Sequence, residues 1–287
     1  MNVESAAATP ASARRQIWLC ADDYGISPGV NVAIRDLVLR RRINATSVMV
    51  AAPSCHRAET LALACLIGSS GVAVGLHVTL SAPFVPLSAG FAPLRDGKFL
   101  PLPRLLARAV AHRLQPDLLT AEVTAQVRRF TDLFGRAPDF IDGHQHVHLF
   151  PQIRDVVLSV AQSAAPMAWV RQCGRSPTTS KSWSDGKGLV LDALSGQFRK
   201  RAAARGIDTN PAFAGTYTYR TGADFAALFP RFLDNLPDGG LVMCHPGFVD
   251  AELRRLDPLT HLREQEYAFF AGDEFPRVLA QRGVALA

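Results

Sequence analysis

Three histidines at alternating positions follow an aspartate in the segment 138-PDFIDGHQHVHLFP-151. The four side chains are Asp142, His144, His146 and His148. Imidazole and carboxylate groups bind Zn²⁺ and also act as acids and bases. On an extended strand they would share one face at about 6.5 to 7 Å per step, too far apart for three histidines to reach one ion through bonds of about 2.1 Å. At most two of them would bind a metal; the alternative is an amphipathic edge strand with surface histidines.

An adjacent pair of aspartates, Asp22 and Asp23, lies in the segment 19-LCADDYGISPGVNVAI-34. Glycine lets the chain turn behind the pair, and Ser27-Pro28 is typical of a helix start. Two carboxylates this close repel each other unless a cation or a proton lies between them, so the pair suits a metal ligand beside a general base. The alternative is that one aspartate caps the following helix while the other is solvated.

Two further histidines occur in apolar surroundings. His77 interrupts the run 74-VGLHVTLS-81, where a hydrogen-bonded core histidine is the alternative to a ligand. His245 ends the run 240-GLVMCHPGF-248 in a His-Pro-Gly turn, which suits an acid or base that titrates near neutral pH. A cap of a helix or turn is the alternative for His245.

The elements that must position these residues follow a regular alternation of short apolar runs and helical patterns. We expect strands at 16–21, 45–51, 72–80, 138–143, 167–172 and 239–245, with a further one at 283–287. We expect helices near 29–42, 56–67, 118–134, 151–164, 189–205, 222–235 and 260–282. Such parallel β/α units close as a barrel or form an open doubly wound sheet, here in a single domain.

The polar residues fall where the predicted strands end. In parallel β/α folds the carboxyl ends of the strands share one face. Side chains more than 220 positions apart in sequence are therefore expected to converge there: Asp22, Asp23, His77, Asp142, His144 and His245.

Segments that do not follow this alternation of strands and helices are predicted to be loops and an N-terminal leader. Residues 81–104 and 172–188 are rich in proline, glycine and serine and read as long loops within the domain. Residues 1–15 are predicted to be a disordered leader, and residues 16–287 the domain. The leader lacks a basic region followed by an apolar one, so we expect a cytoplasmic protein.

Composition narrows the class of protein. The 287 residues are 48% hydrophobic and 20% charged, as in a globular enzyme. The longest apolar stretch, 61–68, falls far short of the roughly 18 to 20 residues needed to span a membrane. Five cysteines without a C-x-x-C pair argue against a disulfide framework or a cysteine zinc site. The net charge of +6 comes from scattered arginines, which favours solvated helix faces over nucleic-acid binding; a basic rim for an anionic or membrane-bound substrate is the alternative.

Four motifs in order resemble one family, the YdjC-like carbohydrate deacetylases. They are ADDYG at 21–25, GLHVTL at 75–80, DGHQHVHLFP at 142–151 and MCHPGF at 243–248. The resemblance implies a deformed TIM-like barrel with one divalent ion, Mg²⁺ or Zn²⁺, bound by one aspartate and two histidines. Carried over by position, it makes Asp23, His77 and His144 the metal ligands, Asp22 the general base and His245 the general acid.

The sequence departs from the family pattern at three places. Tyr24 replaces a phenylalanine and would keep an aromatic wall while adding a hydroxyl, and Gln145 replaces a frequent histidine or lysine, so that position is dispensable for metal binding. The loop 172–188 matches no motif and is expected to shape substrate choice.

The resemblance implies a hydrolase in which a metal-bound water attacks the acetamide of an N-acetylated sugar or oligosaccharide, free or lipid-linked. Asp142, His146 and His148 are then expected to orient a ligand imidazole or line the sugar pocket. Arg171 is expected to contact sugar hydroxyls or balance Asp22, unless it is a surface arginine. The segment 263-REQE-266 is helical in pattern, and we assign it no role.

Two other functions fit the same residues. Aspartate and histidine at barrel strand ends also serve metal-dependent phosphoesterases and amidohydrolases, although most of those sites bind two or more ions. A non-catalytic carbohydrate-binding barrel would keep the fold without needing both aspartates and His245. We expect no nucleic-acid partner, and a homodimer would be compatible with the sequence.

Overall fold

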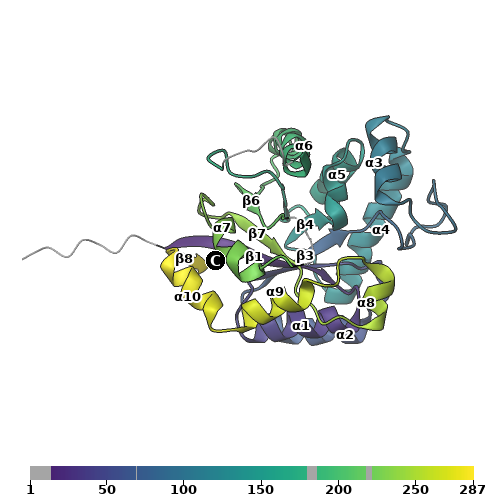
Figure 1. The fold of residues 1–287 in the computed structure, drawn as a ribbon. Coiled ribbons are helices and arrows are strands. Elements are labelled where there is room, and N and C mark those ends of the chain that lie inside the picture. The colour runs from purple at the N-terminus through teal and green to yellow at the C-terminus, as the bar shows by residue number, and fades with distance from the viewer. Residues whose placement is uncertain (1–13, 69, 180–185, 218–221) are drawn as a thin grey trace, which may run out of the picture.

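The structure is a computed structural model and describes residues 14–68, 70–179, 186–217 and 222–287. Its centre is a parallel sheet that curls into a half-barrel (Figure 1). The strands are β1 (Arg15–Tyr24), β2 (Ala45–Val48), β3 (Ala73–Val78), β4 (Phe140–Gly143), β5 (Trp169–Val170), β6 (Phe213–Ala214), β7 (Leu241–Cys244) and β8 (Val284–Leu286). Their order is β5-β4-β3-β2-β1-β7-β6, and β8 pairs with the first residues of β1. The predicted single-domain α/β fold with a deformed barrel is confirmed.

Helices surround the sheet and cover its apolar side chains. They are α1 (Pro28–Leu39), α2 (Arg57–Ile67), α3 (Leu102–Val110), α4 (Pro116–Phe134), α5 (Ile153–Ala164), α6 (Gly186–Ala203), α7 (Phe225–Phe232), α8 (Ala251–Leu256), α9 (Arg263–Ala271) and α10 (Glu274–Gln281). In Figure 1, α8 and α9 lie beside α1, far from it in sequence, while α4 and α5 pack together at another side of the sheet. The core lies between the strands and these helices, where burial of apolar side chains stabilises the fold.

All seven expected strands are present, and the differences concern short elements. β6 consists of two residues, too few to give a pattern, and was not predicted. The helices α3 and α8 were not predicted either, and the helix expected at 260–282 is divided into α9 and α10 around Gly272. The predicted loop at 172–188 already enters α6 at Gly186, and its residues 180–185 lie outside the described part.

Two further expectations concern the N-terminal leader and membrane-spanning helices. Residues 1–13 of the predicted leader lie outside the described residues, while Arg15 is the first residue of β1 and its guanidinium donates to the carbonyl of Leu233 at 3.1 Å. Among the helices that the structure describes, none has both the length and the apolar character needed to cross a membrane.

Candidate metal and catalytic site

Parallel pairing brings the polar ends of four strands together. In the register of β3 and β4, His77 lies opposite Asp142. In the register of β1 and β7, Ala21 lies opposite Cys244, so Asp22 and His245 follow on neighbouring strands. These ends surround a cavity of about 330 Å³, which we call the catalytic cavity; the residues named above that line it are Asp22, Asp23, His77, His144, His146 and His245.

A bulge in β1 allows adjacent aspartates to face the same cavity. Successive residues of a regular strand point to opposite faces. The pairing with β2 runs from Ala21 opposite Thr46 to Tyr24 opposite Val48, which leaves one extra residue in β1. Asp23 takes up this residue with φ 73°, a left-handed conformation that is strained for a residue other than glycine. Both carboxylates therefore enter one small volume, both almost fully buried.

Asp23, His77 and His144 present three ligand atoms to one point. Oδ1 of Asp23 lies 3.1 Å from Nδ1 of His144 and 3.4 Å from Nε2 of His77. The three ligand atoms all lie within 4.8 Å of one another, and all three residues are buried. They come from β1, β3 and the segment after β4, so the sheet positions each of them independently.

The two distances from Oδ1 of Asp23 fit a single small divalent ion. Bonds of about 2.1 Å to one ion place neighbouring donor atoms about 3.0 to 3.4 Å apart. One carboxylate and two imidazoles on one side of an ion would leave positions open on the other side, as catalytic metal sites require. The donor set suits zinc and other divalent transition metals, and the oxygen ligand is also compatible with magnesium.

Asp22 lies beside these three residues and pairs with an arginine. Arg171 donates from Nη1 to Oδ2 of Asp22 at 2.7 Å and from Nη2 to Oδ1 at 2.6 Å, and its side chain is 1% exposed. Burial acts to raise the pKa of Asp22, but the charge and hydrogen bonds of Arg171, with His77 and His245, outweigh it and hold this pKa well below the usual range. Asp22 is therefore ionised at neutral pH. Of the two roles expected for Arg171, the structure places it against Asp22.

His77 is oriented by groups on its other ring nitrogen. Its Nδ1 lies 2.6 Å from Oδ1 of Asp142 and 3.0 Å from the hydroxyl of Ser47, which also donates to Asp22 at 3.0 Å. A carboxylate on one nitrogen directs the other nitrogen toward a metal. Burial acts to lower the pKa of His77, but the charges of Asp142 and Asp22 raise it to about 10. Asp142 thus orients the imidazole of His77, and its other oxygen pairs with Arg171.

The three alternating histidines do not lie on an extended strand. β4 ends at Gly143, and residues His144–Leu149 form a short 3₁₀ segment in which Gln145 and His146 both have positive φ, 55° and 60°. A Cβ atom at Gly143 would lie 2.9 Å from Nδ1 of His148, so this turn needs glycine. The expected strand at 138–143 corresponds to β4, and the condition under which the histidines would share one face is not met. The turn instead points the three imidazoles in different directions.

Each imidazole of the segment has separate partners. His144 alone faces Asp23. Nδ1 of His146 lies 3.4 Å from the sulfur of Cys173, and its ring packs edge-on against Phe213 at the wall of the catalytic cavity. His148 is fully buried and its Nε2 donates to the carbonyl of Arg171 at 2.8 Å, so it fixes the turn to the chain after β5.

His148 gives the fold a specific sensitivity to acid. Burial lowers its pKa to about 4, below the ordinary value of about 6.5. The unfolded chain therefore binds a proton between these values while the folded chain does not, and stability falls as the pH drops from about 6.5 to 4. We expect His148→Gln to reduce by about 2 kcal/mol the stability lost between pH 7 and pH 4.5, measured by urea unfolding at both values. An equal loss in the variant and the parent would contradict this.

His245 lines the cavity from the end of β7. Its backbone N–H donates to Oε2 of Glu266 at 2.5 Å, which fixes the turn that carries the imidazole. Burial lowers the pKa of His245 to about 4 despite the opposing charge of Asp23. This direction departs from the near-neutral titration that the sequence suggested, because burial disfavours the charged imidazole.

Two residues of α9 that were assigned no role reach the site. Arg263 is fully buried and its Nη2 donates to Oδ2 of Asp23 at 2.6 Å and to Asp257 at 2.7 Å. Glu266, one turn later, holds the His245 turn. The helical pattern of 263–266 was visible in the sequence, but it did not indicate that this helix lies close to Asp23. Ser47 lies inside an ordinary apolar strand, and no sequence pattern indicated that it would contact the site.

Tyr24 lies away from the cavity. Its hydroxyl donates to the carbonyl of Glu59 in α2 at 2.7 Å and accepts from Arg35 of α1 at 3.0 Å. It thus joins β1 to the helices outside the sheet and is not among the residues that line the catalytic cavity.

The sequence was next compared with known proteins. Residues 16–281 match the profile of the family described as YdjC-like protein. The chain belongs to this family. A chitooligosaccharide deacetylase from Escherichia fergusonii is 30% identical over 248 residues, 84% of this chain and 85% of that protein. Another from Serratia marcescens is 28% identical over 274 residues, 93% of this chain and 94% of that protein.

A solved structure supports the fold. The crystal structure of a protein described as a cellobiose-phosphate cleavage protein from Enterococcus faecalis superposes with a TM-score of 0.70 over 96% of this chain and 97% of that chain. The two sequences are 19% identical, so the likeness concerns the fold alone.

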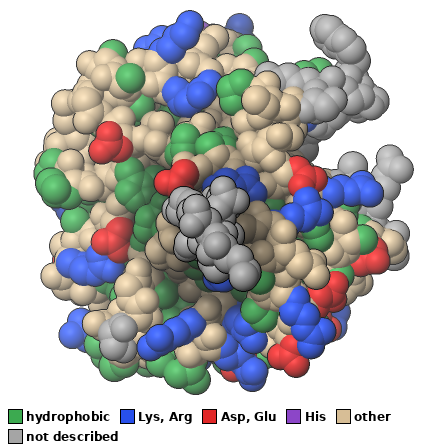
Figure 2. All heavy atoms as spheres, turned by 90° about the vertical axis from the view of Figure 1, so that its left-hand side faces the viewer, with side chains coloured by type: hydrophobic (Ala, Val, Ile, Leu, Met, Phe, Trp, Pro, Cys, Tyr) green, Lys and Arg blue, Asp and Glu red, His purple; other side chains and the backbone are tan. Residues whose placement is uncertain are grey.

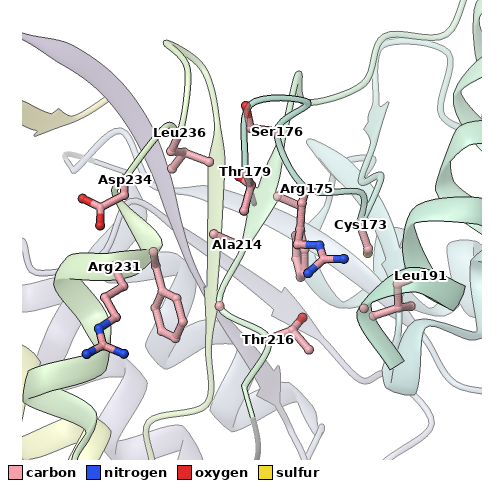
Figure 3. A pocket seen from close by; sticks show the side chains of 14 residues that line it. Cys173, Arg175, Ser176, Thr179, Leu191, Ala214, Thr216, Arg231, Asp234 and Leu236 are labelled. Atoms are coloured by element: carbon pink, nitrogen blue, oxygen red, sulfur yellow. The ribbon is translucent and has the colours of Figure 1, made fainter. Parts of the chain in front are cut away.

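In this YdjC-like chain a second hollow, the side cavity, adjoins the wall formed by His146. It measures about 170 Å³, and Cys173 and Phe213, which contact His146, belong to its lining. Figure 3 shows Arg231 and Asp234 on one side of it and Cys173, Arg175 and Leu191 on the other. The hydroxyl of Thr216 in its lining is buried and has no hydrogen-bond partner among the described residues.

Basic side chains do not form one patch on the face seen in Figure 2. Lys and Arg side chains lie in separate places with Asp and Glu among them. Charges of both signs are therefore interspersed on this face.

Proposed function

We propose that this YdjC-like protein is a metal-dependent deacetylase that hydrolyses the acetamide of N-acetylated sugars. The observation that carries the proposal is the set of Asp23, His77 and His144 around one point, with the ionised Asp22 directly beside it. The deacetylase names of two relatives that align over most of their length support the substrate class.

Asp23, His77 and His144 would hold the ion. A divalent cation there would polarise the acetyl carbonyl and lower the pKa of a water molecule. Asp142 and Ser47 keep His77 directed toward this position, and Arg263 keeps Asp23 there. The buried surroundings exclude bulk water, which strengthens electrostatic interactions with the reacting groups.

Asp22 is the proposed general base. It belongs to the same strand bulge as Asp23 yet makes no contact with His144, so it can accept the proton of an attacking water without serving as a ligand. Arg171 and Ser47 fix both of its oxygens in place. Because these contacts keep the carboxylate ionised, the base is ready at neutral pH.

His245 is the proposed general acid for the departing sugar amine. The neutral imidazole first takes up a proton from solvent, which the negative charge developing on the acetyl oxygen favours, and then passes it to the departing nitrogen. The proton that Asp22 took from the attacking water returns to solvent, so the protons balance over one turnover. Glu266 holds the backbone of this turn and thereby limits the positions that the ring can take.

His146 and the side cavity are proposed to meet the remainder of the substrate. The side cavity mixes aromatic rings with hydroxyl and charged groups, as sugar sites do. Part of the lining, Cys173 to Thr179, comes from the loop that departs from the family pattern, which is consistent with a role in substrate choice.

Acetate release tests the proposal. The purified protein, stripped with a chelator and then given Mg²⁺, Zn²⁺ or Co²⁺, is incubated with N-acetylglucosamine, diacetylchitobiose and longer chitooligosaccharides. We expect acetate and free amine in equal amounts, loss of more than 95% of the activity on chelation, and recovery with at least one ion, about the dependence expected when the ion activates the water. The same preparation is tested with phosphate esters as a control.

Each other outcome selects a different function. Phosphate release without acetate would identify a metal-dependent phosphoesterase. Binding of the sugars without turnover would identify a non-catalytic carbohydrate-binding barrel. Four points stay predictions: whether the ion is Mg²⁺ or Zn²⁺, whether the substrate is lipid-linked, whether the protein forms a homodimer, and whether it is cytoplasmic.

A further inference from the structure

The first turn of α9 brings a buried cation next to a proposed metal ligand. Arg263 has no exposed surface, and its guanidinium lies between Asp23 and Asp257. The helix itself is anchored at the end of β7, because the N–H of Gly247 donates to the carbonyl of Arg263 at 3.2 Å. Arg263 therefore approaches Asp23 from a fixed position.

The two oxygens of Asp23 have different partners. Oδ1 faces His144 and His77, at 3.1 and 3.4 Å. Oδ2 accepts a hydrogen bond from Nη2 of Arg263 at 2.6 Å. The carboxylate cannot turn both oxygens toward the two histidines while this bond is present.

We propose that Arg263 is a positioning residue that restricts Asp23 to binding the ion through one oxygen. This inference rests on the metal site proposed above. A carboxylate that binds through one oxygen occupies one coordination position, whereas one that binds through two occupies an additional position. Arg263 thus reserves a position for water or substrate.

The hydrogen-bond pattern of Arg263 supports a positioning role. Nη1 of Arg263 is buried and has no hydrogen-bond partner among the described residues. An unsatisfied buried donor reduces stability, so this guanidinium is not arranged for stability alone. Nε of Arg263 donates to the carbonyl of Leu259 at 2.8 Å, and Nη2 donates to the carboxylate of Asp257. These two hydrogen bonds fix the plane of the guanidinium.

The sign of the effect on metal affinity separates positioning from simple electrostatics. A positive guanidinium repels a divalent cation, so its removal by itself would tighten metal binding. Loss of a group that orients a ligand weakens binding, by about 10-fold to 100-fold in other metal sites. The two effects oppose each other, and the measured direction shows which one dominates.

The experiment is a titration of the metal-free protein with Co²⁺ by isothermal calorimetry, together with the visible spectrum of the Co²⁺ form, which reports the number of ligands. We expect Arg263→Met and Arg263→Lys to bind Co²⁺ about 10-fold or more weakly than the parent and to change the spectrum. Arg263→Lys retains the charge, and so keeps the test valid if the methionine variant does not fold. Glu264→Gln is the matched control, since Glu264 of the same turn contacts only the backbone of Val249 in the described structure.

The outcomes for the two proposals are distinct. Unchanged or tighter Co²⁺ binding in a folded Arg263 variant, with an unchanged spectrum, would overturn the positioning role and leave the metal site standing. Absence of Co²⁺ binding by the parent protein would overturn the metal site itself. A similar loss of affinity in Glu264→Gln would show that any change in this turn disturbs the site, and would also overturn the specific role of Arg263.

Discussion

Asp22→Asn is expected to lower kcat for acetate release about a thousand-fold while the protein still binds one divalent ion. A positioned general base contributes about 10²-fold to 10⁴-fold to the rate, and an asparagine of the same shape cannot accept the proton. Asp22 lies beside the three ligand residues without belonging to them, so metal binding should persist. Initial rates with diacetylchitobiose and the metal content after dialysis measure the two effects separately.

Asp142→Asn is the matched control for this prediction. Asp142 also pairs with Arg171 and is equally buried, but it contacts His77 rather than the proposed water site. Its replacement removes one partner of Arg171, as Asp22→Asn does, and additionally loosens a ligand imidazole. We expect a smaller loss of kcat, about 10-fold to 100-fold, together with weaker metal binding. If both variants lost kcat equally and kept the metal, Asp22 would act through the ion pair and not as the base.

The positions of the strands, and of the polar residues at their ends, could be predicted from the sequence because both depend on local patterns of apolar and polar residues. An apolar run marks each strand of β1, β3, β4 and β7, and the parallel arrangement then sends their carboxyl ends to one edge. Asp22, His77 and His245 could therefore be expected together although nothing in the sequence gives a distance between them. The alternation of helices and strands predicted parallel β/α units but left a barrel and an open sheet both possible. The resemblance to the family then favoured the barrel.

The features that the sequence did not give arise from backbone exceptions and from contacts between distant segments. The bulge that brings Asp23 beside Asp22 needs a positive φ at an aspartate, which no composition rule signals. Consecutive left-handed residues at Gln145 and His146 likewise turn the chain directly after β4, which the alternation of histidines did not signal. Arg263 reaches Asp23 across 240 positions, and only the packing of α9 against α1 and against the turn after β7 decides that contact.

The balance of buried charge is a further argument for a cation. Four aspartates, Asp22, Asp23, Asp142 and Asp257, meet two arginines, Arg171 and Arg263, which leaves a formal excess of two negative charges. Uncompensated buried charge is strongly unfavourable. A divalent ion with neutral imidazole ligands would balance this excess, whereas without it protons must do so, in agreement with the raised pKa of His77. Metal removal is therefore expected to loosen the cavity as well as to stop the reaction.

The second large effect is expected in the histidine segment, where the replacement of His144 is compared with the replacement of His146 in the same turn. His144→Ala removes one of three ligands, so we expect the stoichiometric ion and more than 99% of the activity to be lost, the scale expected when a catalytic metal is removed. His146→Ala removes an imidazole that contacts Cys173 and Phe213 instead of Asp23, so the ion should remain. Metal content by mass spectrometry of the dialysed variants decides between them.

The same pair of variants also separates metal binding from sugar binding. Because His146 lies in the wall between the catalytic cavity and the side cavity, His146→Ala is expected to raise KM for diacetylchitobiose by more than it lowers kcat. Retention of the ion in His144→Ala with its loss in His146→Ala would reverse the assignment within the segment. The left-handed turn at Gln145 and His146 argues against that reversal, because it points the His146 ring toward Cys173 and leaves His144 as the imidazole of the turn that reaches Asp23.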